Sequence, residues 1–176
     1  MAKTASKPTA ERDHIDRWLD QLRDQLPTLD LRVEGIVDRI NGINRRIRRM
    51  LDETLDEHGL SSGEWHALGK LARSPDGRRS AGELAAAVEL SSAAMTNRLD
   101  RLEKEGLVRR VPDPHDRRSV QIEVTPAGIE LYERTVGAQA AKEAIVAEAL
   151  TASQQDDLND LLRRLMIAFE RRETKG

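Results

Sequence analysis

The chain has 176 residues and no cysteine, which excludes disulfide bonds, thiol catalysis and thiol-based redox sensing. Charged residues make up 34 % of it and aromatic residues 2 %, a balance that favours a helical protein with solvated faces. Because the formal net charge is −2, any affinity for nucleic acid has to come from a local basic patch. No segment approaches the roughly twenty apolar residues that span a bilayer, and no signal-peptide run is present, so we expect a cytoplasmic protein.

Two amphipathic helices are predicted in the N-terminal third, after a polar and disordered tail at residues 1–9. The first covers residues 11–26, places Trp18 on its apolar face and ends at Pro27. The second is a long helix that runs up to Gly59. Its apolar side chains recur every three or four residues at Ile36, Ile40, Ile43, Ile47, Leu51 and Leu55.

Capping motifs mark three short helices in the middle of the chain. Ser61 with Glu64 and Ser80 with Glu83 each form a capping box, separated by a turn-rich connector at residues 74–79. Another N-cap is offered by Ser91 or Ser92. The last two helices follow each other closely, which indicates a helix-turn-helix.

The helix that follows Ser91 is predicted to be a recognition helix. Met95, Leu99 and Leu102 recur at helical spacing and are expected to face inward. The remaining face carries hydrogen-bonding side chains of a length suited to base edges and phosphates. The candidate DNA contacts in this segment are its polar side chains together with Met95. They are Ser91, Ser92, Met95, Thr96, Asn97, Arg98 and Arg101.

A β-hairpin is predicted after Gly106, which sits where a helix end favours a left-handed residue. Residues 107–111 and 119–124 have the β-branched alternation of two strands. The tip between them, residues 112–118, is rich in proline and charge, so it should project from the protein. Arginine at such a tip suits the narrow, negative minor groove of A·T-rich DNA.

Two further helical blocks are predicted at the C-terminus. Thr125 is a suitable N-cap before Pro126 and starts a long helix to about Leu150, and Thr151 with Gln154 starts a last one. The terminal helices cannot bury their apolar faces alone, so we expect a homodimer that spaces two recognition helices about one DNA turn apart. The fold class is mainly α with a small β-hairpin wing. The expected parts are a tail (1–9), N-terminal dimer helices (10–58), a winged helix-turn-helix lobe (60–125) and C-terminal dimerisation helices (126–172).

The segment from Leu90 to Gly128, LSSAAMTNRLDRLEKEGLVRRVPDPHDRRSVQIEVTPAG, resembles the MarR family of transcriptional regulators. The resemblance implies a homodimeric, bacterial, cytoplasmic repressor that binds operator DNA and is released by a small ligand. It also implies that Asp116 orients Arg118 for the minor groove, with Arg117 as a phosphate neighbour.

The added N-terminal helix, with ERDHIDRWLDQ, resembles that of the urate-responsive branch of the same family. The resemblance implies a ligand cleft that includes Trp18, with arginine counterparts at Arg98 and Arg110. The branch has an aspartate where this chain has His66, which changes the hydrogen bonds of the cleft, so another aromatic or anionic effector fits equally well. Trp18 as a simple packing residue is the competing interpretation.

Other features favour less specific interpretations. Arg45, Arg46, Arg48 and Arg49 form either a solvated helix face or a phosphate- or ligand-contacting one. The four histidines lack zinc-ligand spacing, so no metal is assigned, and no cofactor is expected. No nucleophile, phosphate-loop or carboxylate-pair motif indicates an enzyme. The alternative function is a winged helix that binds another protein and not DNA, which an apolar patch at the wing would favour.

Overall fold

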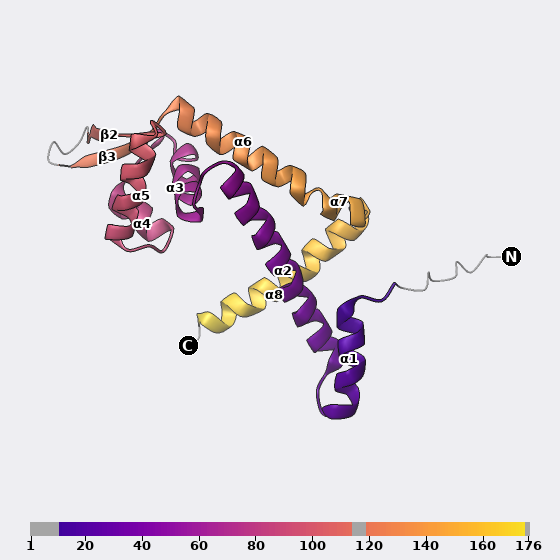
Figure 1. Ribbon diagram of the computed structural model, residues 1–176. Coiled ribbons are helices and arrows are strands. Elements are labelled where there is room, and N and C mark those ends of the chain that lie inside the picture. The colour runs from indigo at the N-terminus through magenta and orange to yellow at the C-terminus, as the bar shows by residue number, and fades with distance from the viewer. Residues whose placement is uncertain (1–10, 114–118, 175–176) are drawn as a thin grey trace. The chain divides into compact units, whose positions relative to one another are not determined.

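The computed structural model describes residues 11–113 and 119–174 as helices, strands and connecting turns (Figure 1). The chain divides into two compact units, residues 1–49 and residues 50–176. The expected disordered tail at residues 1–9 lies outside the described residues. Helix α2 (Leu31–Glu57) is continuous through the boundary between the units. In the described part of the chain, no helix is long and apolar enough to cross a membrane.

The first unit is a helical hairpin of α1 (His14–Gln25) and the N-terminal part of α2. The side chain of Asp13 caps α1 by accepting hydrogen bonds from the backbone N–H groups of Ile15 and Asp16. Gly35 allows a close approach of the two helices, because a Cβ there would lie 3.1 Å from a methyl group of Leu19. Ile15 is buried between the helices.

Arg39 ties the two helices of this hairpin together. Its guanidinium donates to the carboxylate of Asp13 at 3.0 Å and to that of Asp16 at 2.6 Å. The pKa of Asp13 is lowered to about 2, first by the backbone hydrogen bond from Asp16 and then by Arg39. A carboxylate whose pKa is depressed on folding stabilises the fold above its unfolded pKa and loses that effect as the pH falls through its folded pKa.

We therefore expect α1 to loosen from α2 as the pH falls from about 4 towards 2. The fluorescence of Trp18, in a Trp65→Phe background where it is the sole tryptophan, measures this. In the Asp13→Asn variant the N-cap remains, since asparagine caps helices as well as aspartate does. The ion pair between Asp13 and Arg39 is lost, while that between Asp16 and Arg39 remains. At pH 7 α1 should already pack less tightly on α2 in this variant than in the unaltered protein, and its Trp18 fluorescence should change less on acidification. Identical fluorescence curves against pH for the variant and the unaltered protein would contradict the role given to Asp13.

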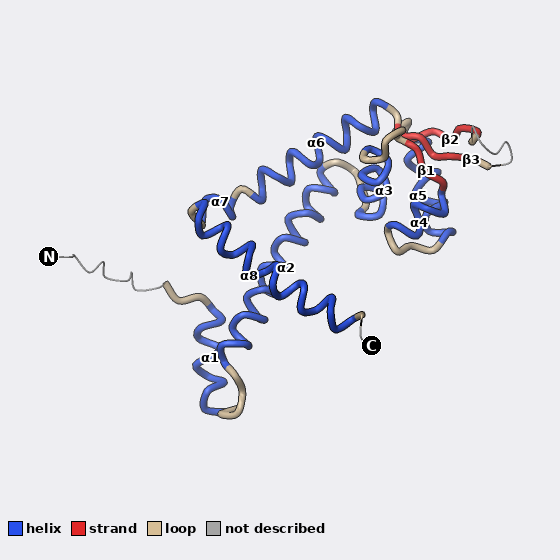
Figure 2. The backbone as a smooth tube through the Cα atoms, turned by 180° about the vertical axis from the view of Figure 1, so that it is seen from behind, coloured by secondary structure: helices blue, strands red, loops and turns tan. Residues whose placement is uncertain are grey.

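The second unit contains a winged helix-turn-helix. Its elements are α3 (Ser62–Ala72), β1 (Arg78–Ser80), α4 (Ala81–Ala87), α5 (Ser92–Lys104), β2 (Val108–Pro112) and β3 (Val120–Val124). The three strands form an antiparallel sheet in the order β1-β3-β2 (Figure 2). The capping boxes predicted at Ser61 and Ser80 are confirmed, and Ser91 is the N-cap of α5.

Strand β1 was not predicted, since its segment was expected to belong to a turn-rich connector. Gly77 adopts a left-handed backbone (φ +70°) that turns the chain into the strand. Arg78 then pairs with Glu123 of β3, both in the strand register and through its guanidinium at 2.6 Å. The strand is therefore held by partners far away in the sequence, which no local pattern reveals.

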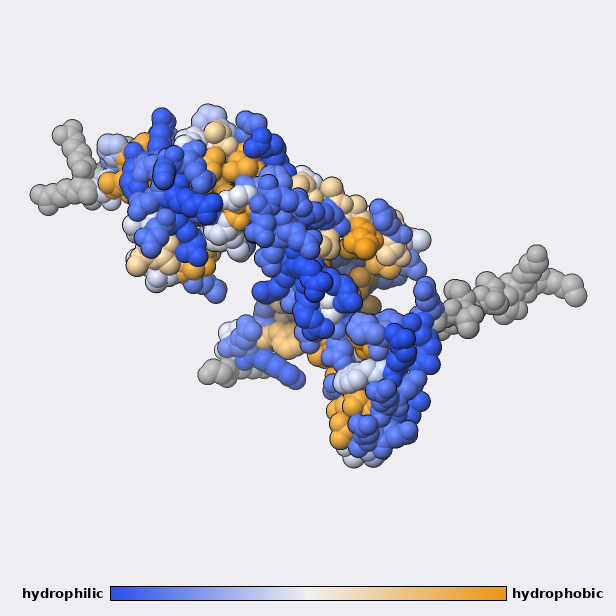
Figure 3. Space-filling model, viewed as in Figure 1, coloured by the Kyte–Doolittle hydropathy of each residue, from blue (hydrophilic) through white to orange (hydrophobic). Residues whose placement is uncertain are grey.

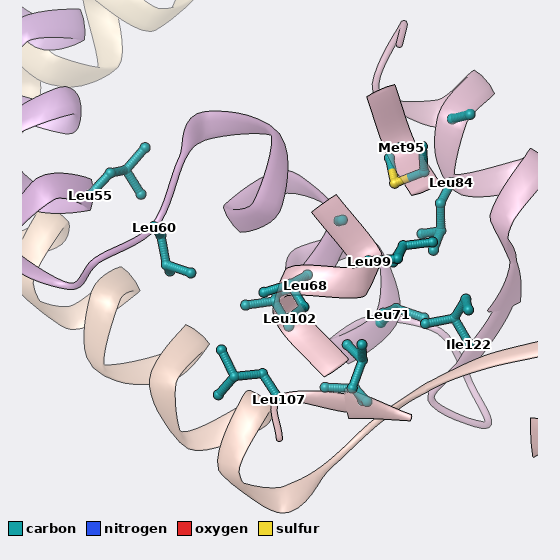
Figure 4. Close-up of a cluster of buried hydrophobic side chains, with 14 residues drawn as sticks. Leu55, Leu60, Leu68, Leu71, Leu84, Met95, Leu99, Leu102, Leu107 and Ile122 are labelled. Carbon is teal, nitrogen blue, oxygen red and sulfur yellow. The ribbon is translucent and has the colours of Figure 1, made fainter. Parts of the chain in front are cut away.

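A single apolar core holds the winged helix-turn-helix together (Figure 4). Leucines of α3, α4 and α5 meet there with Ile122 of β3, and Leu55 at the end of α2 joins them. The fully buried side chains include Leu68, Leu71, Leu84, Met95, Leu99 and Leu102. One face each of α3, α4 and α5 is thereby fixed inward, which leaves the opposite face of α5 for solvent.

The C-terminal helices are α6 (Pro126–Glu143), α7 (Ile145–Ala149) and α8 (Ala152–Glu173). The predicted caps at Thr125 and Thr151 are confirmed, but the long helix expected to reach Leu150 ends at Glu143 and is followed by the short α7. A buried hydrogen bond of 3.0 Å from Thr54 to Gln139 links α2 to α6.

No side chain of α7 or α8 is buried in the described chain, and hydrophobic surface lies over the region of α7 (Figure 3). The exposed apolar residues of α8 include Leu158, Leu161, Leu162, Leu165, Met166 and Phe169.

Candidate nucleic-acid interface

Helix α5 begins at a well-defined cap and turns one face into the core. The hydroxyl of Ser91 accepts a hydrogen bond from the backbone N–H of Ala94. The predicted inward positions of Met95, Leu99 and Leu102 are confirmed. Met95 is fully buried, close to Leu84 (Figure 4). Its inclusion among the DNA contacts was therefore wrong, because its place on the helix points its side chain into the core.

The solvent-facing side of α5 carries Ser92, Thr96 and Asn97, all exposed. The Thr96 hydroxyl donates to the backbone carbonyl of Ser92 at 2.9 Å. Among the described residues, the Asn97 amide has no hydrogen-bond partner. An asparagine amide can pair with both N6 and N7 of adenine in the major groove. The rigid helix thus presents an unoccupied donor and acceptor side by side.

Arg98 lies back against α3. Its Nη1 donates to the carbonyl of Ala94 at 3.0 Å, and its Nε is buried without a partner among the described residues. A Cβ at Gly63 would lie only 2.4 Å from that Nε, so the glycine makes room for the guanidinium. The prediction that Arg98 contacts DNA therefore requires this side chain to swing outward.

Arg101 connects α5 to the start of α3. It lies 3.4 Å from the buried carboxylate of Glu64 and 3.1 Å from that of Glu105, and it donates to the carbonyl of Gly59 at 2.6 Å. The side-chain hydrogen bond with Glu105 is the main reason why the pKa of Arg101 is raised. This arginine is thus largely engaged within the protein, although half of its side chain remains exposed.

Arg110 of β2 connects the wing to α5. Its guanidinium pairs with Asp100 at 2.6 Å and with Glu103, and its backbone N–H donates to Glu103 at 2.9 Å. The hydrogen bond with Asp100 is the largest cause of its raised pKa. Two carboxylates on the outer side of α5 are thereby neutralised by the wing strand.

A second ion-pair set lies on the sheet and was not predicted. Glu123 of β3 pairs with Arg109 and Arg78 from the strands on either side, and these two contacts, in that order, lower its pKa. β1 and β2 each carry two adjacent arginines and β3 carries one glutamate, and only the strand register shows which of these charges meet. The predicted wing-tip residues Asp116, Arg117 and Arg118 lie outside the described residues.

The three predicted ligand residues fall in different parts of the chain. Trp18 belongs to the first unit, where it lines a groove of about 220 Å³ with His14, Asp38 and Arg45. His66 and Arg110 belong to the second unit. The His66 ring packs edge-on against Trp65, and its Nδ1 lies 2.7 Å from the carbonyl oxygen of Ser62.

Metal binding has no support in the described part of the chain, where no group of three or more histidine, aspartate and glutamate side chains could hold an ion.

A rigid helix with a polar outer face, joined to a β-hairpin by ion pairs, defines a winged helix-turn-helix protein. A family profile of the MarR family matches residues 58–119. The transcriptional regulator PecS of Dickeya dadantii is 30 % identical over 154 residues, covering 87 % of this chain and 90 % of PecS. The chain belongs to the MarR family.

Solved structures show the same fold. The YusO protein of Bacillus subtilis superposes with a TM-score of 0.70 at 22 % identity, over 80 % of this chain and 99 % of YusO. The complex of Staphylococcus aureus MepR with DNA superposes with a TM-score of 0.60 at 21 % identity, over 73 % of this chain and 96 % of MepR.

Proposed function

We propose that the protein is a transcriptional regulator, a homodimeric repressor that binds a palindromic operator in the bacterial cytoplasm. The observation that carries this proposal is the outer face of α5, where the free amide of Asn97 stands beside Ser92 and Thr96 on a helix fixed by the core. The names of PecS, a regulator, and of the MepR complex with DNA support it. Both relatives are regulators or DNA-binding proteins and not enzymes.

The homodimer is supported by the uncovered apolar face of α8. Its leucines are 40–56 % exposed, which is unusual for a regular apolar stripe on a soluble helix. A second copy of the same helix offers an equal stripe, and a two-fold interface pairs like with like. A two-fold dimer presents its two α5 helices to the two halves of a palindrome.

We also propose that a small ligand releases the protein from its operator DNA. We infer an aromatic or anionic effector that involves Trp18, His66 and Arg110, and the groove beside Trp18 supports the first of these positions. Such an effector weakens DNA binding if it binds more tightly to a conformation of the dimer that does not fit the operator. Unchanged operator affinity at a saturating concentration of a bound ligand would rule this part out.

The experiment that tests the proposed function is selection of retained sequences from a pool of random duplex DNA at two salt concentrations. We expect a palindrome with half-sites about one helical turn apart. Binding should weaken as salt increases, because the protein displaces counterions from the phosphates. If no sequence is enriched at either salt concentration, either the wing is a surface for another protein or the purified protein is in a non-binding state, and the effector has to be sought first.

Replacing Asn97 with alanine should weaken binding to the selected operator by about 1–3 kcal/mol, which is about 5- to 150-fold. The loss should be largest on the operator that has adenine at the contacted position, because alanine removes both hydrogen bonds to that base. Fluorescence anisotropy of labelled duplexes measures this. Asn159→Ala, the same change on the exposed surface of α8, is the control and should bind as the unaltered protein does. Equal affinities for all three proteins would remove Asn97 from the interface.

A further inference from the structure

Four neighbouring arginines in the middle of α2 have no acidic partner among the described residues. Arg45, Arg46, Arg48 and Arg49 are all exposed, and among the described residues no carboxylate lies within 4.0 Å of any of them. No acidic residue occurs between Asp38 and Asp52, and Asp52 and Glu53, one helical turn after Arg48 and Arg49, form no ion pair with them among the described residues. We call these four side chains the arginine face.

The arginine face differs from the other basic groups described above. Arg39, Arg101 and Arg110 are each held by two carboxylates. In the arginine face, Arg46 donates to the carbonyl of Gly42 at 2.9 Å, and Arg48 donates to the side chain of Asn44 at 3.3 Å. These neutral acceptors leave the positive charges uncompensated, in a protein whose net charge is −2.

The helix geometry sets the shape of this charged surface. With 3.6 residues per turn, Arg45 and Arg49 lie about 40° apart around α2 and about 6 Å apart along it. Successive phosphates of one DNA strand advance about 3.4 Å along the duplex axis, so about 6 Å corresponds to two nucleotides. Arg45 and Arg49 lie at least about 120° around α2 from Ile43 and Ile47, so a partner that covers the apolar stripe leaves these two arginines accessible. Arg46 lies closer to the stripe and lines a groove with Ile43.

We propose that the arginine face binds backbone phosphates of the DNA that flanks the operator. The inference rests on the proposed function and adds a second contact surface outside the winged helix-turn-helix. Arginine suits this role because its planar, permanently charged guanidinium donates two parallel hydrogen bonds to a phosphate. Phosphate contacts carry no sequence information, so this surface contributes affinity without changing the sequence that is selected.

The test compares the unaltered protein with an Arg45→Gln, Arg49→Gln double variant. The DNA is the operator recovered by selection, in two duplexes: one with the operator alone and one with about ten more base pairs on each side. Binding is measured across a series of salt concentrations. Arg163→Gln with Arg171→Gln, two exposed arginines on α8, is the charge-matched control.

We expect the unaltered protein and the control to bind the longer duplex more tightly, and the Arg45→Gln, Arg49→Gln variant to lose that gain. The slope of log affinity against log salt should fall by about 0.9 for each lost phosphate contact, thus by up to about 4 for a dimer. The selected sequence should stay the same.

Three results would overturn the inference. The first is an unchanged salt slope with the longer duplex, while the unaltered protein still binds its operator. The second is loss of the dimer in the double variant, measured by light scattering, which would assign the arginine face to the contact between copies. The third is absence of operator binding by the unaltered protein, which alone would also remove the proposed function.

Discussion

Replacing Gly128 with alanine should destabilise the winged helix-turn-helix by about 2–3 kcal/mol and lower its melting temperature by about 5–10 °C. Gly128 lies in the first turn of α6, where a Cβ would be 2.1 Å from the carbonyl oxygen of Leu107 and 2.9 Å from Val124. The carbonyl belongs to the backbone, so it cannot move aside as a flexible side chain does. Thermal unfolding followed by circular dichroism measures the effect.

The same carbonyl explains why this clash also affects function. Leu107 O accepts hydrogen bonds from the backbone N–H and the hydroxyl of Thr125, at 3.0 and 3.1 Å. The junction between α5 and the wing is therefore joined to the start of α6. An alanine that pushes these segments apart should displace α5 and the wing relative to each other and weaken operator binding.

Gly137 provides a control within the same helix. A Cβ there meets nothing within 4 Å, so Gly137→Ala has only the helix-propensity gain, about 1 kcal/mol in favour of folding. The two Gly→Ala changes should thus shift the melting temperature in opposite directions. If both raise it, the close packing at Gly128 is not as described.

Replacing Leu165 with glutamate should convert the dimer into monomers. Leu165 is 41 % exposed on the apolar face of α8, in a row with Leu158, Leu161 and Leu162. Burying one leucine contributes about 1.5–3 kcal/mol, and a two-fold interface contains the residue twice. The dissociation constant of the dimer should therefore rise by about 100- to 10⁴-fold. Sedimentation analysis over a range of protein concentrations detects the shift.

Operator binding should fall together with dimerisation, because one half-site holds a monomer only weakly. Arg163→Gln changes the net charge by the same amount, on a different side of α8, and should leave both properties unchanged. A Leu165→Glu protein that remains dimeric would show that another surface joins the copies.

The local chemistry of the chain predicts most of the fold. Serine, threonine and aspartate at helix starts satisfy backbone N–H groups that have no partner within the helix, so Ser61, Ser80 and Thr151 mark their helices correctly. Apolar spacing likewise predicts that Leu99 and Leu102 face the core. These features depend on neighbours within four residues, which the sequence places together.

Features that depend on distant partners could not be predicted in this way. Strand β1 exists because Arg78 meets Glu123, 45 residues away. Arg101 was predicted to contact DNA and Arg110 to contact a ligand, yet acidic side chains of the protein form ion pairs with both. Met95 is different, because its helical spacing with Leu99 and Leu102 did predict its burial, and its place among the candidate DNA contacts disagreed with that spacing.

The pairing of Arg110 with Asp100 and Glu103 has a consequence for how the protein meets its target. Ordering a flexible segment at the moment of binding costs entropy, typically about 0.5–1.5 kcal/mol for each side chain that becomes immobile. Here that ordering takes place during folding, because the ion pairs already align the wing strand with α5. The surface formed by α5 and the wing strand is thus pre-organised before DNA binds. Non-operator DNA cannot reshape this surface to fit, which favours discrimination between DNA sequences.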